Sequence, residues 1–397
     1  MRTAFKIIFM VSLALTSCVE EEVIQEDEKP NEVTLDETVS GPANIGFSIE
    51  GEIGFETNTD ISFTNESQNL AEVSWEFGDG AVSSEQQSVT HSYADAGKYT
   101  VTIHGITSDG EVLSHSKTIF VRKNGAELGL LFISFLDSTL NYVDLNTEAK
   151  TTLYKVPHNP AGVLALNENE NKVYYYDYSD STIYENDLYT NNPVPLLLDV
   201  PGVSDLEFDE ATGDLLIALP YANLIFRYNP STPTLEPVYS SVRSGKFGRV
   251  RDMDLKSGSL YTITPTQSYE SVFKVDLTLG DASQLINYEE GGYGYGVAFD
   301  DLNQKVYFNN VEQAALMRSE VDGSNIEKVI DLDRSGTVSF AGLCLTGMRV
   351  VETRNQLMWS SWEDGKLYIL DLETYQEEMI ELEGLTGKFV TYENTDF

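Results

Sequence analysis

The C-terminal part of the chain repeats one short strand pattern six times. Mostly apolar four-residue runs, spaced 43, 42, 45, 46 and 51 residues apart, start at Leu130, Val173, Leu215, Leu260, Val306 and Leu357. A second strand-like run that ends in an acid or an amide follows each of them. Each unit is therefore expected to be a short antiparallel sheet that cannot bury its faces alone. A period of about 40 to 50 residues predicts a β-propeller, here with six blades over residues 127–397.

The ends of this region are predicted to meet. A leading strand precedes five of the six runs, at residues 162–166, 203–208, 250–255, 296–300 and 347–351. The first run lacks one, whereas residues 387–392 at the end of the chain have the matching pattern. We therefore predict that the C-terminal strand completes the first blade and removes an open sheet edge that would promote aggregation.

Residues 45–123 show a different pattern, with apolar and polar residues alternating at period two between turn clusters. This alternation predicts a half-buried antiparallel sheet in a segment of sandwich size. The segment contains WEFGDG at 75–80, HSY at 91–93 and GKYTV at 97–101. In these motifs it resembles the PKD family of immunoglobulin-like domains, which implies a β-sandwich acting as a spacer or weak binding module.

The WEFGDG motif also makes a local prediction. Trp75 and Phe77 are expected to point into the core, and Gly78 and Gly80 to form a turn that needs positive φ angles. The residues of the HSY motif, His91 and Tyr93, are expected to brace that turn.

The N-terminus has the pattern of a secretory signal. Arg2 and Lys6 precede an apolar stretch, 7–15, that is too short to remain as a membrane span. The sequence Leu-Thr-Ser-Cys at 15–18 resembles the lipobox of bacterial lipoproteins. This resemblance implies that residues 1–17 are removed and that Cys18 carries lipid, giving a stable membrane anchor.

Residues 18–44 are rich in glutamate and lack a periodic apolar face, which predicts a disordered tether. Three acids at 20–22 resemble the export signal of outer-membrane surface lipoproteins. The net charge of −39, from 64 acids and 25 bases, argues against nucleic acid as a partner, because phosphate binding needs concentrated Lys and Arg. The expected location is the outer membrane, at the cell surface.

Individual blades resemble the YWTD repeats of low-density-lipoprotein-receptor propellers. Tyr176-Asp177 and Trp359-Ser360-Ser361 are degenerate versions of the signature, and the sequence VDGS at 321–324 reproduces its companion motif. In that family the repeated aromatic and aspartate residues mostly hold blades together. The resemblance therefore supports the fold and leaves the function open.

Candidate ligand-binding residues lie where the leading strands and their loops would meet a central channel. They are Asp205, Arg249, Arg251, Asp252, Tyr293, Tyr295, Trp359 and Trp362. Aromatic faces can stack on sugar rings while Asp and Arg supply flanking hydrogen bonds. A structural alternative stands beside this hypothesis: Asp205 and Asp252 occupy equivalent repeat positions and could cap the channel end, and Trp359 could belong to the core.

The sequence does not favour an enzymatic function. The propeller region has one histidine, His158, which argues against a histidine-built metal site or a Ser-His-Asp triad. A calcium-dependent lactonase would need a carboxylate and amide constellation; Asp205, Asp252 and Asp300 could contribute, but no Asn stands at the matching positions. Glycoside hydrolysis by a pair of carboxylates stays an alternative, because the chain has many acidic residues.

The sequence thus predicts an all-β protein, an immunoglobulin-like sandwich followed by a six-bladed propeller. We expect a non-catalytic, lipid-anchored protein without a cofactor, with calcium as an open alternative. The expected partner is an extracellular polysaccharide, or alternatively another envelope protein.

Overall fold

The computed structural model describes residues 42–50, 55–85, 87–95, 97–122, 127–156, 160–220, 224–240, 250–265, 270–278, 281–287, 294–333, 343–361, 365–385 and 387–394. Cys18, Arg249, Tyr293 and Trp362 lie outside the described residues, as do the expected signal peptide and almost all of the expected tether. Within the described parts the regular structure is β, apart from the short 3-10 helix η3 (Glu352–Arg354). In those parts no helix has the length and apolarity needed to cross a membrane.

The N-terminal domain is a sandwich of two sheets. One sheet has the order β1-β3-β6, with β1 at Phe47–Ile49, β3 at Ile61–Asn65 and β6 at Ser88–His91. The other has the order β2-β8-β7-β4-β5, with bounds Phe55–Glu56, Val112–Arg122, Gly97–Ile106, Glu72–Glu76 and Val82–Ser83. Alternate residues of the strands point inward, so that Phe63, Trp75 and Val101 are fully buried between the sheets. The sandwich predicted from period-two alternation is confirmed.

The turn after β4 has the predicted bracing. Gly78 and Gly80 have φ angles of 86° and 94°, which other residues rarely adopt. His91 Nε2 lies 2.7 Å from an Asp79 carboxylate oxygen, and its ring stacks on Phe77 at 4.3 Å between centroids. The Tyr93 hydroxyl donates to the Phe77 carbonyl at 2.9 Å. The side chains of His91 and Tyr93 thus both hold the turn, as predicted.

The C-terminal domain consists of six four-stranded antiparallel sheets, the six blades of the predicted propeller. Blade 2 contains β12 (Pro160–Asn167), β13 (Lys172–Asp177), β14 (Thr182–Asp187) and β15 (Val194–Leu197). Blade 3 contains β16 (Asp205–Asp209), β17 (Asp214–Leu219), β18 (Leu224–Asn229) and β19 (Thr234–Ser240). Blade 4 contains β20 (Asp252–Lys256), β21 (Ser259–Pro265), β22 (Glu270–Asp276) and β23 (Asp281–Asn287).

The other three blades follow the same order. Blade 5 contains β24 (Val297–Asp300), β25 (Lys305–Asn310), β26 (Ala315–Glu320) and β27 (Glu327–Asp331). Blade 6 contains β28 (Leu345–Val351), β29 (Gln356–Ser361), β30 (Lys366–Asp371) and β31 (Glu377–Glu381). Blade 1 is composite and contains β32 (Phe389–Asn394), β9 (Glu127–Ile133), β10 (Thr139–Asp144) and β11 (Lys150–Lys155).

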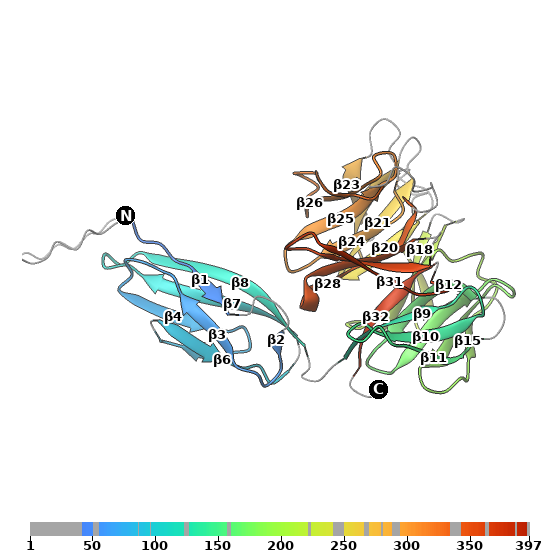
Figure 1. Ribbon diagram of the computed structural model, residues 1–397, viewed down its shortest axis with the longest axis horizontal. Helices are drawn as coiled ribbons and strands as arrows, with labels where there is room; N and C mark the ends of the chain where they lie inside the picture. The colour runs from blue at the N-terminus through green and yellow to red at the C-terminus, as the bar shows by residue number, and fades with distance from the viewer. Residues whose placement is uncertain are drawn as a thin grey trace, which may run out of the picture. The chain divides into compact units, whose positions relative to one another are not determined.

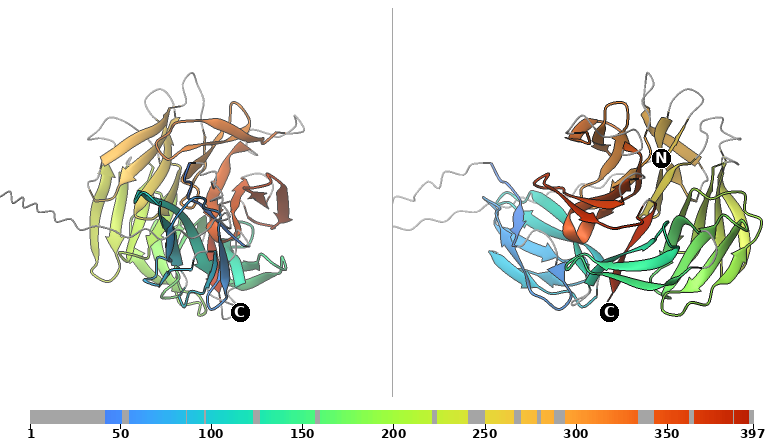
Figure 2. Two further views of the ribbon diagram at one scale, coloured as in Figure 1. Left: turned by 90° about the vertical axis from the view of Figure 1, so that its left-hand side faces the viewer. Right: turned by 45° about the vertical axis from the view of Figure 1, so that its right-hand side comes forward.

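The two ends of the propeller meet in blade 1, as predicted. Strand β32 pairs antiparallel with β9, from Phe389 opposite Phe132 to Asn394 opposite Glu127. In Figures 1 and 2 the red C-terminal strand lies beside the green strands of the first blade. The first strands of successive blades contact one another in a closed ring, so they line the central channel. We call the end of the channel where these first strands begin the mouth.

The acid or amide that ends the third strand has a local role in three of the blades. In blades 1, 3 and 6, Asp144, Asn229 and Asp371 each accept backbone N–H bonds from two residues of the next turn, at 2.7–3.4 Å. Such side-chain caps fix the hairpin to the outermost strand. The repeated polar residue is therefore explained by turn geometry.

Apolar side chains from neighbouring blades bury one another. Ala298, Tyr307 and Leu316 of blade 5 form one cluster with Met348 and Trp359 of blade 6. A cluster of the same kind joins blade 6 to blade 1 and includes the closing strand through Phe389. Burying a large apolar side chain stabilises a fold by roughly 1.5–3 kcal/mol. Each blade is therefore stabilised by its neighbours, which explains why all six are needed.

Candidate functional site

Charged side chains gather in the channel, and the layer nearest the mouth joins three blades. Lys388, just before β32, places its Nζ 2.8 Å from an Asp205 carboxylate oxygen and also ion-pairs with Asp252. Asp205 begins β16 and Asp252 begins β20, and both carboxylates are fully buried. The single ammonium group of Lys388 thus pairs with two carboxylates, one on blade 3 and one on blade 4.

A second charged layer lies one pleat deeper. Arg349 of β28 pairs with Glu207 of β16, and its Nε lies 3.9 Å from Asp254 of β20. The Arg349 guanidinium also donates to the carbonyl oxygens of Met253 and Met348 at 3.1 and 2.7 Å. Residues two apart on a strand share a face, so the same strands supply the acids of both layers.

Burial changes the proton affinity of these acids. It raises the pKa of Glu207 to about 8, because the loss of solvent outweighs the attraction of Arg349. Burial likewise raises the pKa of Asp254, with Arg349 and Lys256 opposing it. Deeper still, Lys256 Nζ pairs with Glu352 at 2.9 Å. Perturbed carboxyl groups of this kind occur at functional sites and also in structural ion-pair networks.

The channel carboxylates also bind backbone groups of the next blade. Asp205 accepts the N–H of Met253 at 2.6 Å, and Asp252 accepts the N–H of Val297 at 2.9 Å. Asp254 repeats the contact with the N–H of Phe299 at 2.6 Å. Each contact satisfies a buried donor on a neighbouring first strand. These aspartates therefore hold blades 3, 4 and 5 together. For Asp205 and Asp252 this is the structural role that the sequence offered as an alternative to ligand binding.

Two predicted residues do meet at the mouth. The Arg251 guanidinium lies over the Tyr295 ring, 4.3 Å from its centroid, joining the loops that lead into blades 4 and 5. The Tyr295 backbone is held by Asn309, whose side-chain oxygen accepts its N–H at 2.8 Å. Both side chains are half-buried. They bring a cation and an aromatic ring into one place, as the binding hypothesis requires.

Trp359 does not meet them. It is 1% exposed in β29, and its ring stacks on Tyr368 of β30 within the blade 5–6 cluster. The expectation that Trp359 stacks on a sugar ring is therefore wrong, because both apolar neighbours and burial exclude a ligand. Its core role follows from its position in the strand repeat.

A calcium ion does not fit the set Asp205, Asp252 and Asp300. The ammonium of Lys388 already occupies the position between the first two carboxylates. Asp300 ends β24 and binds Asn303 of its own turn, with its oxygens 2.9 Å from the Asn303 backbone and side-chain nitrogens. Across the described ranges no three His, Cys, Asp or Glu side chains converge as a metal site.

The sequence prediction missed four residues of the two charged layers. Lys388 was expected only as part of a closing strand, and Glu207, Asp254 and Arg349 only as parts of leading strands. A signal exists in hindsight: the first strands otherwise alternate apolar residues, so a charge at an inward position indicates a channel partner. The partner itself lies 142 residues away for Glu207 and Arg349, which no local pattern reveals.

Two comparisons with known proteins concern the two domains separately. Residues 40–121 match the family described as PKD domain. The chain matches no curated protein. A chain of the nidogen/laminin complex is 12% identical with a TM-score of 0.56, covering 68% of this chain and 100% of that one. TolB from Acinetobacter baumannii is 10% identical with a TM-score of 0.49, covering 74% of this chain and 79% of that one.

A protein of unknown function from Bacteroides thetaiotaomicron is 11% identical with a TM-score of 0.46, covering 88% of this chain and 92% of that one. At such identities the likeness to the nidogen/laminin chain shows the fold alone, and it supports the fold expected from the YWTD resemblance. The chain therefore contains a PKD domain at residues 40–121, followed by a six-bladed β-propeller.

Proposed function

We propose that this chain is a non-catalytic lipoprotein of the outer membrane, anchored through Cys18, displayed at the cell surface and using no cofactor. Its propeller binds an extracellular polysaccharide at the mouth of the channel, and its PKD domain acts as a spacer. The anchor and location rest on the resemblance of the N-terminal residues to a lipobox and an export signal.

The observation that carries the binding proposal is the Arg251–Tyr295 pair. A guanidinium stacked 4.3 Å from a ring centroid is held in one orientation, so its donors are preorganised for hydroxyl or carboxylate oxygens. The pair joins two loops at the mouth, beside the sequence positions of Arg249 and Tyr293. Aromatic and arginine side chains together are typical of sugar-binding and protein-binding surfaces.

The non-catalytic part of the proposal is supported by the use of the channel carboxylates. Asp205, Asp252 and Asp254 each accept a backbone N–H from the next blade. An acid that holds two blades together is poorly placed to change its protonation or to bind substrate during a reaction. Glu207, whose pKa burial raises to about 8, is paired with Arg349 in the deeper layer.

The test is affinity electrophoresis and a glycan array with the full chain, in calcium and in EDTA. Arg251→Ala and Tyr295→Ala are compared with Lys328→Ala, which removes an exposed cation from the outermost strand of blade 5. We expect retention by a polysaccharide that both mouth variants weaken at least tenfold and the control leaves unchanged. Failure of every polysaccharide to retain the chain would refute the proposal.

A protein partner is the second candidate, favoured by exposed apolar side chains. Phe135 and Leu136 are 65% and 67% exposed in the turn between β9 and β10, and Leu198 is 67% exposed after β15. These connections belong to the mouth end of their blades. Such exposed apolar side chains could insert into apolar pockets of a partner protein. Because the net charge of this chain is −39, the surface around those pockets is expected to be basic. Crosslinking on intact cells, lost in a Phe135→Ser/Leu136→Ser variant, would support this candidate.

A further inference from the structure

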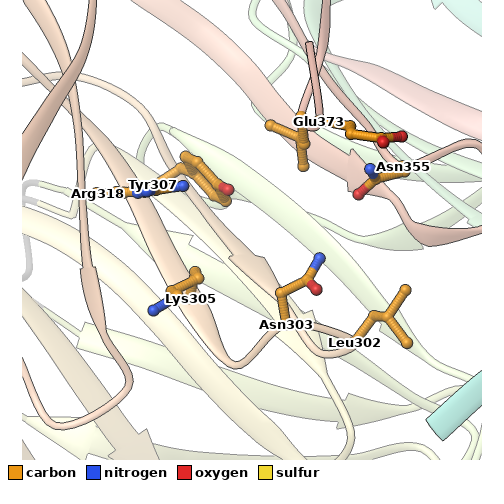
Figure 3. A pocket seen from close by; sticks show the side chains of 8 residues that line it. Leu302, Asn303, Lys305, Tyr307, Arg318, Asn355 and Glu373 are labelled. Carbon is orange, nitrogen blue, oxygen red and sulfur yellow. The ribbon is translucent and has the colours of Figure 1, made fainter. Parts of the chain in front are cut away.

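A hollow lies between blades 5 and 6, at the end of the first strands opposite the mouth. Its volume is about 390 Å³, within the range of roughly 300–1,000 Å³ found for small-ligand pockets. Polar side chains around it, shown in Figure 3, come from the turns after β24, β28 and β30 and from β25 and β26: Asn303, Lys305, Tyr307, Arg318, Asn355 and Glu373.

The two cations of the hollow are already neutralised. Lys305 Nζ lies 2.5 Å from the carboxylate of Glu320, its cross-strand neighbour. Arg318 Nε lies 2.6 Å from the carboxylate of Glu327, its neighbour on β27. With Glu373 added, the formal charges of these residues do not favour an anion. A ligand that needs a net positive site therefore does not suit the hollow.

Donors and acceptors nevertheless remain on both sides. A lysine ammonium has three donors and a guanidinium has five. Arg318 also donates from Nη1 to the Tyr375 hydroxyl at 2.5 Å and bonds to Tyr307, but neither cation uses all of its donors on these partners. Asn303 donates its Nδ2 to Asp300 at 2.9 Å, which leaves its side-chain oxygen as an acceptor. In Figure 3 the amide of Asn303 lies on one side of the hollow, and the amide of Asn355 and the carboxylate of Glu373 lie together on another.

Hydroxyl groups match this mixture, because each one both donates and accepts. Leu302 and Leu372 add apolar surface for the carbon face of a ring, and Tyr307 is also part of the lining. Tyr307 is only 2% exposed, so binding would rest on hydrogen bonds and not on stacking.

We propose that the hollow between blades 5 and 6 binds one neutral, hydroxyl-rich sugar unit. This site lies at the other end of the blades from the Arg251–Tyr295 pair, and it is independent of polysaccharide binding at the mouth. Glu373 and Asn355 accept and donate hydrogen bonds to vicinal hydroxyls, and Lys305 and Arg318 donate from fixed positions.

Two substitutions remove side chains from the hollow with little cost to the fold. Asn355 has a left-handed φ of 52°, so Asn355→Gly deletes the amide and keeps a favourable backbone conformation. Glu373 is exposed, and Glu373→Ala deletes its carboxylate. The matched controls are Asn325→Gly, at a φ of 52° in another turn, and Glu312→Ala, at another exposed turn position.

The experiment is saturation-transfer NMR and calorimetry on the full chain with glucose, galactose, mannose, xylose, maltose and cellobiose. Glucuronate and inorganic phosphate serve as anionic probes. We expect at least one neutral sugar to bind, with affinity falling at least tenfold in the Asn355→Gly/Glu373→Ala variant and unchanged in the control pair.

Three results would overturn the proposal. They are no binding of any neutral sugar, equal binding by the hollow variant and the wild type, and binding of only the anionic probes. A sugar lost in Arg251→Ala but kept in the hollow variant would place binding at the mouth and refute the hollow. The two proposed sites are thereby separated by their own variants.

Discussion

Removal of the Lys388 ammonium is expected to destabilise the propeller strongly. The side chain is 6% exposed and lies between the carboxylates of Asp205 and Asp252, each fully buried. In Lys388→Met, both carboxylates would stay buried without their cation. Breaking a buried ion pair in this way costs about 3–5 kcal/mol. We expect the upper part of that range because one cation serves two acids, which is a large fraction of a typical stability of about 5–15 kcal/mol.

Differential scanning calorimetry of the full chain at pH 7 measures this effect, and the transition of the PKD sandwich serves as an internal reference. We expect the propeller transition to fall by roughly 8–20 °C, because the expected loss is about 4–5 kcal/mol and 1 kcal/mol corresponds to about 2–4 °C in domains of comparable size. Lys328→Met, at an exposed pair with Asp331, should change stability by less than about 1 kcal/mol.

A triple variant, Lys388→Met/Asp205→Asn/Asp252→Asn, tests the electrostatic cause. The amides carry no charge and keep an oxygen that can accept the N–H bonds of the next blade, so we expect recovery of much of the lost stability. The reasoning would be refuted if the propeller of Lys388→Met had the same melting temperature as that of the Lys328→Met control. It would also be refuted if the triple variant were no more stable than Lys388→Met.

Three further predictions concern other parts of the fold. Deleting residues 388–397 removes β32 and should give an aggregating propeller; a soluble truncate with an unchanged melting temperature would contradict ring closure. Burial raises the pKa of Glu207 from 4.5 to about 8, so its contribution to stability is present below pH 4.5 and lost as the pH rises through 8. Glu207→Gln should therefore flatten the fall in stability between pH 5 and 8, by at most about 1.4 kcal/mol per pH unit in urea titrations. Gly78→Ala would place a Cβ 2.8 Å from Thr100 backbone atoms at a φ of 86°, and should lower the sandwich transition while leaving the propeller transition in place.

Ring closure was predictable from the sequence because strand patterns are local. The strand-like segment at residues 387–392 and the missing strand before Leu130 together identify the pairing, and β32 pairs with β9 in the structure. The exact start of a strand was less predictable: the leading strand expected at 203–208 is observed at Asp205–Asp209. Strand ends depend on hydrogen bonds to neighbouring strands, which a single run of residues does not specify.

The candidate site was only partly predictable. Arg251 and Tyr295 were both named as residues that head inner strands, but their contact at the channel mouth was not predicted. Trp359 was misplaced, since an aromatic residue in a strand can face either the core or a ligand and the sequence does not decide which. The hollow between blades 5 and 6 was not predicted, since its lining comes from turns of two different repeats.

By itself, the sequence determined the all-β class, the sandwich, the number of blades and the closing strand, because alternation, turn residues and repeat spacing are short-range properties of the chain. Only the tertiary structure decided which charges meet. Lys388 lies 183 residues from Asp205, and they become partners because ring closure brings blade 1 across the channel from blade 3. Acidic residues such as Asp205 and Asp252 would be exposed in an isolated repeat. They are buried and paired only because the ring closes around them.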